Sequence, residues 1–100
     1  MRLTELQRSK LCRLIEMALV DINVLASTGK PRQAADLARV FQKLAAGVWR
    51  GSFDLKRFLD RDLVLFFAKY RRARIWMRLP KYADVVNEVL DAQGMDYAKN

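Results

Sequence analysis

Hydrophobic residues recur along this chain every three or four positions, which is the spacing of one face of an α-helix. The first such stripe predicts a helix over residues 4–26, with Thr4 and Gln7 as a capping box at its start. The same segment carries a second apolar face, so we expect the helix to pack against neighbours on two sides. The two faces consist of Leu11, Ile15, Ala18, Ile22 and Leu25, and of Leu14, Met17, Val20 and Val24.

Glycine and proline divide the remainder of the chain into further helical segments. Gly29 suits the end of the first helix and Pro31 the first turn of a second, which the apolar pattern places at residues 31–48. A third helix, the longest, is predicted over residues 53–79. We expect it to end at Pro80, because the residue before a proline disfavours helical backbone.

A short fourth helix is predicted over residues 81–93, with Gly94 as its stop and residues 95–100 as a frayed tail. The sequence shows no alternating pattern typical of a β-strand. A chain of 100 residues is too short to divide into two parts that each bury a core. We therefore predict a single all-α domain, either a compact four-helix bundle or an irregular four-helix array.

Positive charge is concentrated in the predicted third helix and its flanks. The whole chain holds 19 Lys and Arg against 11 Asp and Glu, a formal net charge of +8. Ten of those basic residues and only three of the acidic ones lie between Trp49 and Lys81. Clustered positive charge beside large aromatic side chains indicates a surface that binds an acidic partner.

Arginines of the predicted third helix supply most of the candidate binding residues. In a continuous helix, Arg71, Arg74 and Arg78 are three and four positions apart, so their side chains project from one side. Guanidinium groups bind carboxylates and phosphates with two parallel hydrogen bonds. The predicted partner-binding set is Trp49, Arg57, Arg61, Phe67, Arg71, Arg72, Arg74 and Arg78.

Two kinds of partner fit this set. Arginine together with aromatic residues is typical of protein interfaces, which favours a regulator or adaptor that docks its arginine-rich third helix on an acidic protein. The alternative is a nucleic-acid-binding accessory protein that contacts the phosphate backbone through the same helix. The sequence leaves open whether Val64, Phe67 and Ile75 are core or interface, and with it whether a second copy binds there as a homodimer. Membrane binding is not expected, because the core needs the apolar side of residues 69–79.

Several functional classes are disfavoured by what the sequence lacks. The chain has no histidine, the commonest general acid–base residue and metal ligand. We therefore expect no catalytic site, no metal and no cofactor.

The single cysteine, Cys12, excludes an intramolecular disulfide, and the apolar helix around it predicts a buried thiol. The longest apolar run, Leu63–Ala68, is far short of the roughly 20 residues that span a bilayer, and the first residues lack a signal-peptide pattern, so we expect a cytoplasmic protein.

Overall fold

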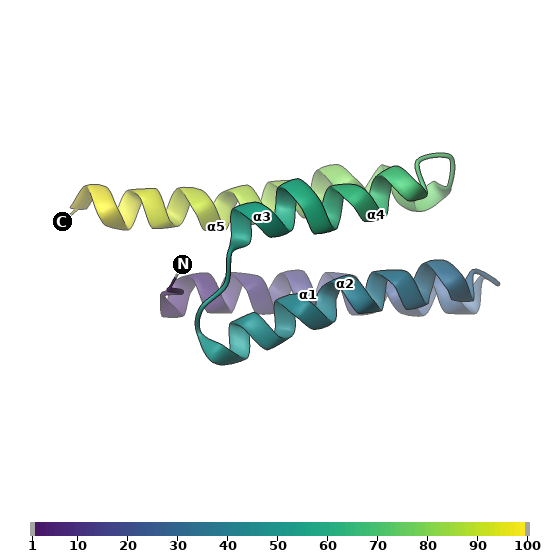
Figure 1. Ribbon diagram of the computed structural model, residues 1–100, viewed down its shortest axis with the longest axis horizontal. Coiled ribbons are helices and arrows are strands. Elements are labelled where there is room, and N and C mark those ends of the chain that lie inside the picture. The colour runs from purple at the N-terminus through teal and green to yellow at the C-terminus, as the bar shows by residue number, and fades with distance from the viewer. Residues whose placement is uncertain (1, 100) are drawn as a thin grey trace.

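Four helical segments of the chain pair as two antiparallel hairpins, one stacked on the other (Figure 1). The computed structural model describes the backbone of residues 2–99 and the side chains of residues 2–91. The predicted all-α four-helix array is confirmed. The elements are α1 (Glu5–Ser27), α2 (Pro31–Arg50), α3 (Leu55–Arg57), a π-helical stretch (Phe58–Leu63), α4 (Val64–Lys69), a 3₁₀-helix (Arg74–Arg78) and α5 (Leu79–Lys99).

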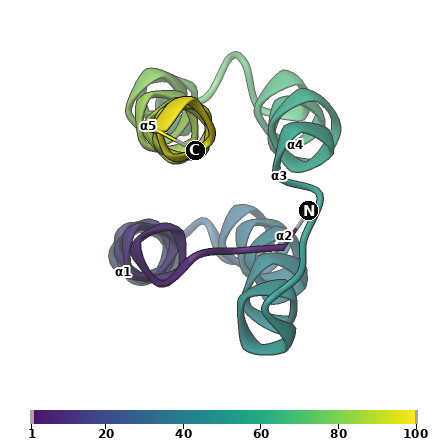
Figure 2. The same ribbon diagram turned by 90° about the vertical axis from the view of Figure 1, so that its left-hand side faces the viewer.

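The two hairpins lie helix over helix. In the end-on view of Figure 2, α5 lies above α1, while α3 and α4 lie above α2. The chain therefore runs back and forth along the bundle in sequence order, and its two ends lie at the same end of the molecule (Figure 1). The turns after α1 and after α4 both lie at the opposite end, which we call the turn end.

The first helix begins with the capping box that the sequence predicts. The Thr4 hydroxyl accepts a hydrogen bond from the Gln7 backbone N–H (3.1 Å), and the Thr4 N–H donates to Gln7 Oε1 (2.8 Å). Gln7 is fully buried and also donates through Nε2 to the backbone carbonyl of Val89 (3.3 Å). The cap therefore joins the start of α1 to α5.

The second helix continues to Arg50, past the predicted end at residue 48, so Trp49 belongs to its last turn. Gly51 then adopts a left-handed conformation (φ 77°), which favours glycine and lets the chain leave the helix. The ring of Phe53 folds back onto the backbone at Gly47, where an added Cβ would lie only 2.2 Å from Phe53 Cδ2. This contact fixes where the second hairpin starts relative to the first.

The predicted third helix over residues 53–79 is wrong as a single element. Helical backbone stops at Lys69, the chain turns through residues 70–73, and a 3₁₀-helix follows before α5 begins at Leu79. Pro80 does not end a helix but occupies the first turn of α5, where a missing N–H costs nothing. A continuous helix of this length would extend about 40 Å and carry its second half beyond the bundle.

The predicted end of the fourth helix is also wrong, because α5 passes through Gly94 and continues to Lys99. A glycine can stay inside a helix at a cost of about 1 kcal/mol relative to alanine, so it is a weaker stop than its position suggests. Asn100, the last residue of the predicted frayed tail, lies outside the described residues.

The core resolves the question that the sequence left open about three apolar residues. Phe67 is fully buried and Ile75 is nearly so, whereas Val64 is 41% exposed. The Phe67 ring packs on that of Tyr82, which in turn packs on Phe41, with ring centroids 5.8 and 5.5 Å apart. Aromatic side chains from three of the four helical segments therefore meet at the centre of the bundle.

The thiol of Cys12 is exposed on α1, so the predicted buried thiol is wrong. Cys12 lies beside the buried stripe of Gln7, Leu11 and Leu14 but does not belong to it. None of the helices, over the residues that the structure describes, has the length and apolar character needed to cross a bilayer.

Candidate functional site

The structure separates part of the predicted binding set from the turn end. Trp49 is on the last turn of α2, and Arg57 is on α3, which lies near the middle of the long axis of the molecule (Figure 1). Arg61 follows in the π-helical stretch, and the end of α4 lies roughly 18 Å beyond Arg57 at 1.5 Å per residue. These residues therefore do not form one surface with the remaining arginines. The turn end holds Arg71, Arg72, Arg74 and Arg78.

Phe67 is a core residue, so its prediction as a partner contact is wrong. The sequence interpretation extended a regular helical repeat through the segment, which placed Phe67 among the arginines. The π-helical stretch over Phe58–Leu63 has wider turns, and these rotate every side chain that follows relative to a regular α-helix. The rotation brings Phe66 and Phe67 together into the core, with their ring centroids 5.0 Å apart.

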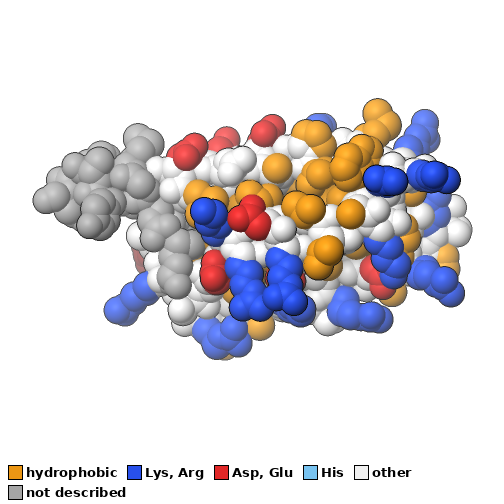
Figure 3. Space-filling model, turned by 45° about the horizontal axis from the view of Figure 1, so that its top comes forward, with side chains coloured by type: hydrophobic (Ala, Val, Ile, Leu, Met, Phe, Trp, Pro, Cys, Tyr) orange, Lys and Arg blue, Asp and Glu red, His pale blue; other side chains and the backbone are white. Residues whose placement is uncertain are grey.

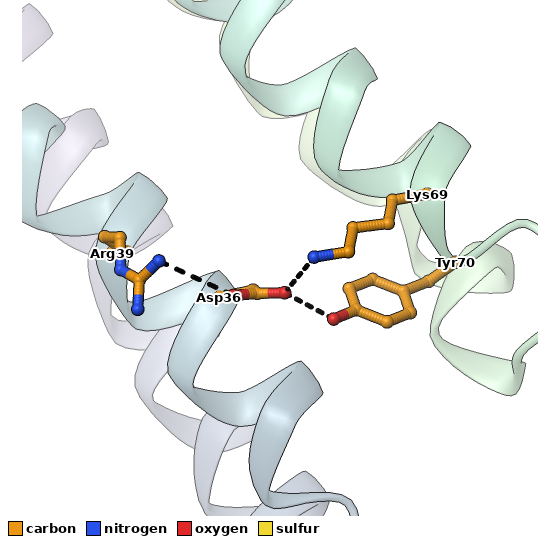
Figure 4. Close-up of polar contacts among 4 residues, drawn as sticks. All are labelled: Asp36, Arg39, Lys69 and Tyr70. Carbon is orange, nitrogen blue, oxygen red and sulfur yellow. Dashed lines mark hydrogen bonds and ion pairs between the residues drawn. The ribbon is translucent and has the colours of Figure 1, made fainter.

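Asp36 of α2 holds the start of the turn that carries the arginines (Figure 4). Its Oδ2 accepts hydrogen bonds from the Tyr70 hydroxyl and from Lys69 Nζ, the latter at 2.9 Å. Arg39 Nη1 lies 3.9 Å from the other carboxylate oxygen. The hydrogen bond from Tyr70, and next that from Lys69, hold the pKa of the Asp36 carboxyl below its usual value. Burial raises the pKa of Tyr70, and its hydrogen bond to Asp36 adds to that effect.

Asp21 of α1 holds the other end of the same connection. Its Oδ2 accepts hydrogen bonds from the Tyr82 hydroxyl (2.5 Å) and from Arg78 Nε (3.0 Å). Tyr82 is fully buried and Asp21 is 8% exposed, whereas a third of the Arg78 side chain remains exposed. Burial raises the pKa of Tyr82, with the hydrogen bond to Asp21 as the next cause, so the hydroxyl stays a donor. Arg78 is thus oriented through Nε, and its two Nη groups are left for other contacts.

Both acids are engaged in these anchors rather than with the arginines that lie between them. Arg71, Arg72 and Arg74 are exposed, and within the described part of the chain none of them forms an ion pair. Trp76 and Met77, on the same 3₁₀-helix as Arg74, are 41% and 75% exposed. Figure 3 shows basic side chains gathered at this end of the molecule beside hydrophobic ones. We call the surface of Lys30, Arg71, Arg72, Arg74 and Arg78 the cationic end.

A cavity of about 310 Å³ opens between the end of α1 and the 3₁₀-helix. Its walls combine apolar side chains with three cations and with Asp21, whose carboxylate accepts hydrogen bonds from Arg78 and Tyr82. Because that acid is already engaged, the cavity accepts an apolar group and a carboxylate side by side. The residues that define this character are Val24, Leu25, Ile75, Lys30, Arg74 and Arg78. Sequence reasoning missed Lys30, Val24 and the anchoring Asp21. One signal was available: Asp21 lies on the buried stripe of α1, where a charged residue requires a partner.

The chain was compared with models of protein families, with curated proteins and with solved structures, and none of these comparisons gave a match. Its function is therefore argued from the cationic end and from the cavity beside it.

Proposed function

We propose that this protein is a non-enzymatic regulator or adaptor that docks an acidic partner protein on its cationic end. The observation that carries the proposal is that the two nearby acids, Asp21 and Asp36, are bonded within the bundle and do not pair with the arginines of the turn. Asp21 and Asp36 bond inward to the two ends of the connection over residues 70–78, which leaves Arg71, Arg72 and Arg74 directed to solvent. Because the turn is anchored on both sides, its arginines lose less backbone freedom when a partner binds.

A protein partner is favoured by the apolar side chains among the cations. Met77 and Trp76 are exposed beside Arg74, and the neighbouring cavity is lined by Val24 and Ile75. The centres of protein interfaces are enriched in arginine, methionine and aromatic residues. A protein partner also supplies apolar side chains to pack against them, which a nucleic-acid backbone does not. An acidic protein segment supplies both carboxylates for the arginines and side chains for the cavity.

A second candidate function is binding to a nucleic-acid backbone, and a different observation favours it. Residues 68–73 enclose a shallow concavity of about 480 Å³ that is lined by the side chains of the turn, including Arg71 and Arg72. Adjacent guanidinium groups in such a concavity suit phosphate oxygens. Binding of this kind loses affinity steeply as salt rises, with each neutralised phosphate adding about one to the slope.

The test is affinity capture from a lysate of the native cell, with and without nuclease. Two triple variants are compared with the wild type: Arg71→Gln with Arg72→Gln and Arg74→Gln, and Arg50→Gln with Arg57→Gln and Arg61→Gln. Both remove the same charge from exposed residues, but only the first changes the cationic end. The second variant also tests Arg57 and Arg61, which the sequence placed in the same site.

We expect acidic proteins to be retained by the wild type and by the second variant but not by the first. We expect them to remain bound after nuclease treatment. If the captured proteins are lost after nuclease treatment, the cationic end binds nucleic acid and the second candidate function is favoured. Equal loss from both triple variants would show that net charge, rather than this surface, is responsible. No retained protein in any sample would refute docking at the cationic end.

A further inference from the structure

The cavity between the end of α1 and the 3₁₀-helix has an apolar floor. Leu25 and Ile75 line it and are only 5% and 6% exposed, so they lie at its base. Val24 also lines it but is 54% exposed, which places its side chain at the mouth. The volume of about 310 Å³ is at the lower end of the range of roughly 300–1,000 Å³ that is typical of ligand pockets. The cavity therefore has room for one apolar side chain rather than for a folded segment.

Positive charge exceeds negative charge in the walls of this cavity. Lys30, Arg74 and Arg78 line it together with one acid, Asp21, so three positive charges against one negative leave a net charge of +2. That acid already accepts hydrogen bonds from Arg78 Nε and from the Tyr82 hydroxyl. Among the side chains that the structure describes, neither Lys30 nor Arg74 forms an ion pair. An anion that enters the cavity therefore meets two unpaired cations and the Nη groups of Arg78.

The other polar groups at the end of α1 are bonded within the chain. The Thr28 hydroxyl donates to the backbone carbonyl of Val24 (2.8 Å), and the Lys30 backbone N–H donates to that of Leu25 (2.9 Å). Carbonyl groups without partners at the end of a helix carry partial negative charge, which repels an anion. Because these two carbonyls have donors, they oppose the cations of the cavity less than those of an uncapped helix would.

We propose that this cavity binds the C-terminal residue of the acidic partner, with its apolar side chain over Leu25 and Ile75 and its terminal carboxylate at the three cations. This inference rests on the proposed function and names the segment of the partner that enters the site. A C-terminal residue carries a carboxylate and an apolar side chain on one Cα atom, so a small cavity can hold both. An internal Asp or Glu has no apolar group beyond its own methylenes, so two residues and the chain between them would have to enter. Capture of a terminal carboxylate is a recurring mode of peptide recognition, and guanidinium groups bind carboxylates with two parallel hydrogen bonds.

A free small acid shares this chemistry but leaves part of the cationic end unused. Arg71 and Arg72 are exposed at the same end of the molecule and do not line the cavity. A partner chain whose last residue is in the cavity continues out of the mouth, where its preceding acidic side chains can reach these two arginines. The charge outside the cavity therefore favours the end of a protein chain over a free acid.

The experiment uses a library of eight-residue peptides with free C-termini and all positions randomised, selected against the full chain. An enriched peptide is labelled at its N-terminus and titrated by fluorescence anisotropy in two forms, with a free terminal carboxylate and with a terminal amide. Amidation removes the terminal charge and changes no side chain.

Two pairs of matched variants test the walls of the cavity. Val24→Gln is compared with Val20→Gln, because Val20 is 60% exposed one turn earlier on α1 and does not line this cavity. Lys30→Gln is compared with Lys56→Gln, because Lys56 is exposed on α3, outside the cavity. Glutamine is neutral and favours helix, and circular dichroism checks that each variant keeps its fold.

We expect the enriched peptides to end in an apolar residue and to carry Asp or Glu before it. We expect the amide to bind about tenfold or more weakly than the free acid. Val24→Gln and Lys30→Gln should each weaken binding by about fivefold, and their controls by less than about twofold. The proposal is overturned if nothing is enriched, if the last residue is not apolar, if the amide binds as tightly as the acid, or if both cavity variants bind as tightly as their controls.

Failure of this inference and failure of the proposed function are distinguishable in the same titration. Arg71→Gln with Arg72→Gln leaves every residue of the cavity unchanged. If binding depends on these two arginines but not on the terminal carboxylate, acidic docking at the cationic end stands and binding of a C-terminus is refuted. If binding depends on neither, both proposals fail.

Two other occupants of the cavity are outcomes of the same experiment. If 4-methylpentanoate, which has an apolar group and a carboxylate but no peptide chain, binds more tightly than the enriched peptide, the cavity takes a free acid and the inference is wrong. If the chain is a dimer in solution and Val24→Gln dissociates it, a second copy covers the cavity and the inference is also wrong.

Discussion

Replacing Asp21 with alanine tests the anchor on which the geometry of the cationic end depends. The substitution leaves the fully buried Tyr82 hydroxyl without its acceptor and Arg78 without its carboxylate. An unsatisfied buried hydroxyl costs roughly 1–3 kcal/mol, and the Arg78 pair adds less than a buried pair would, because a third of that side chain is exposed. We therefore expect Asp21→Ala to lower the free energy of unfolding by about 2–4 kcal/mol.

A double-mutant cycle with Tyr82→Phe separates the hydrogen bond from other effects of the substitution. In the Tyr82→Phe background no buried hydroxyl is orphaned, so Asp21→Ala should cost about 1–2 kcal/mol less than in the wild type. The assay is urea unfolding followed by circular dichroism, with equal m-values as the check that all four proteins unfold from comparable states. A coupling energy below about 0.5 kcal/mol would show that the buried contact between Asp21 and Tyr82 does not stabilise the fold.

Three further results are expected from the same urea assay. Because the pKa of Asp36 is lowered in the folded state, its carboxylate stabilises the protein above the unfolded pKa of about 3.9, and this stabilisation is lost as the pH falls through the folded pKa. The loss of unfolding free energy caused by Asp36→Asn should therefore shrink below about pH 4, and a loss that stays constant with pH contradicts this. Gly47→Ala should cost about 1–3 kcal/mol because the Phe53 ring occupies the space of the added methyl group, and less when combined with Phe53→Ala; equal costs in both backgrounds argue against the contact. Trp49→Ala should change stability by less than about 0.5 kcal/mol, since Trp49 is 85% exposed, and a larger loss would mean that the indole is covered.

The bounds of the helices that local pattern alone specifies were predicted well, but the expected packing of a second apolar face of α1 is wrong at Val20 and Val24, which are 60% and 54% exposed. α1 and α2 each combine an apolar stripe with recognisable ends: a capping box at Thr4, a glycine and proline pair between the helices, and Gly51 after α2. These signals act over a few residues and are therefore readable without the fold. The boundary at Arg50 differs from the predicted one by little more than half a turn.

The third segment was predicted wrongly because tertiary contacts decide where it breaks. Residues 70–73 contain neither glycine nor proline, and arginine and alanine favour helix, so nothing local marks a turn. The break coincides with the contact of Tyr70 with Asp36, a residue of another helix that lies far away in sequence. Pro80 is compatible with either the end or the first turn of a helix, and only the return of the chain over α1 selects the second.

The candidate site was predictable in its charge but not in its construction. Counting residues located the excess of Lys and Arg in the right part of the chain, and Arg71, Arg72 and Arg74 are indeed exposed. The grouping of those arginines with Arg57 assumed one continuous helix, which the structure does not have. The contribution of Lys30 could not be found at all, because only the folded chain brings the turn after α1 to the same end as the turn after α4.

Two of the contacts that join the hairpins, those of Asp21 and Asp36, also contribute to the positive charge of the cationic end. Asp21 and Asp36 belong to the first hairpin, whereas every residue that they anchor from outside it belongs to the second. Each acid that turns inward to hold the connection over residues 70–78 is one that no longer neutralises the surface. The arginines therefore divide into two kinds. Arg71 and Arg72 act on the surface potential alone, so their loss should reduce the salt dependence of binding without affecting stability. Arg78 serves both the anchor and the surface, so its loss should affect both measurements together.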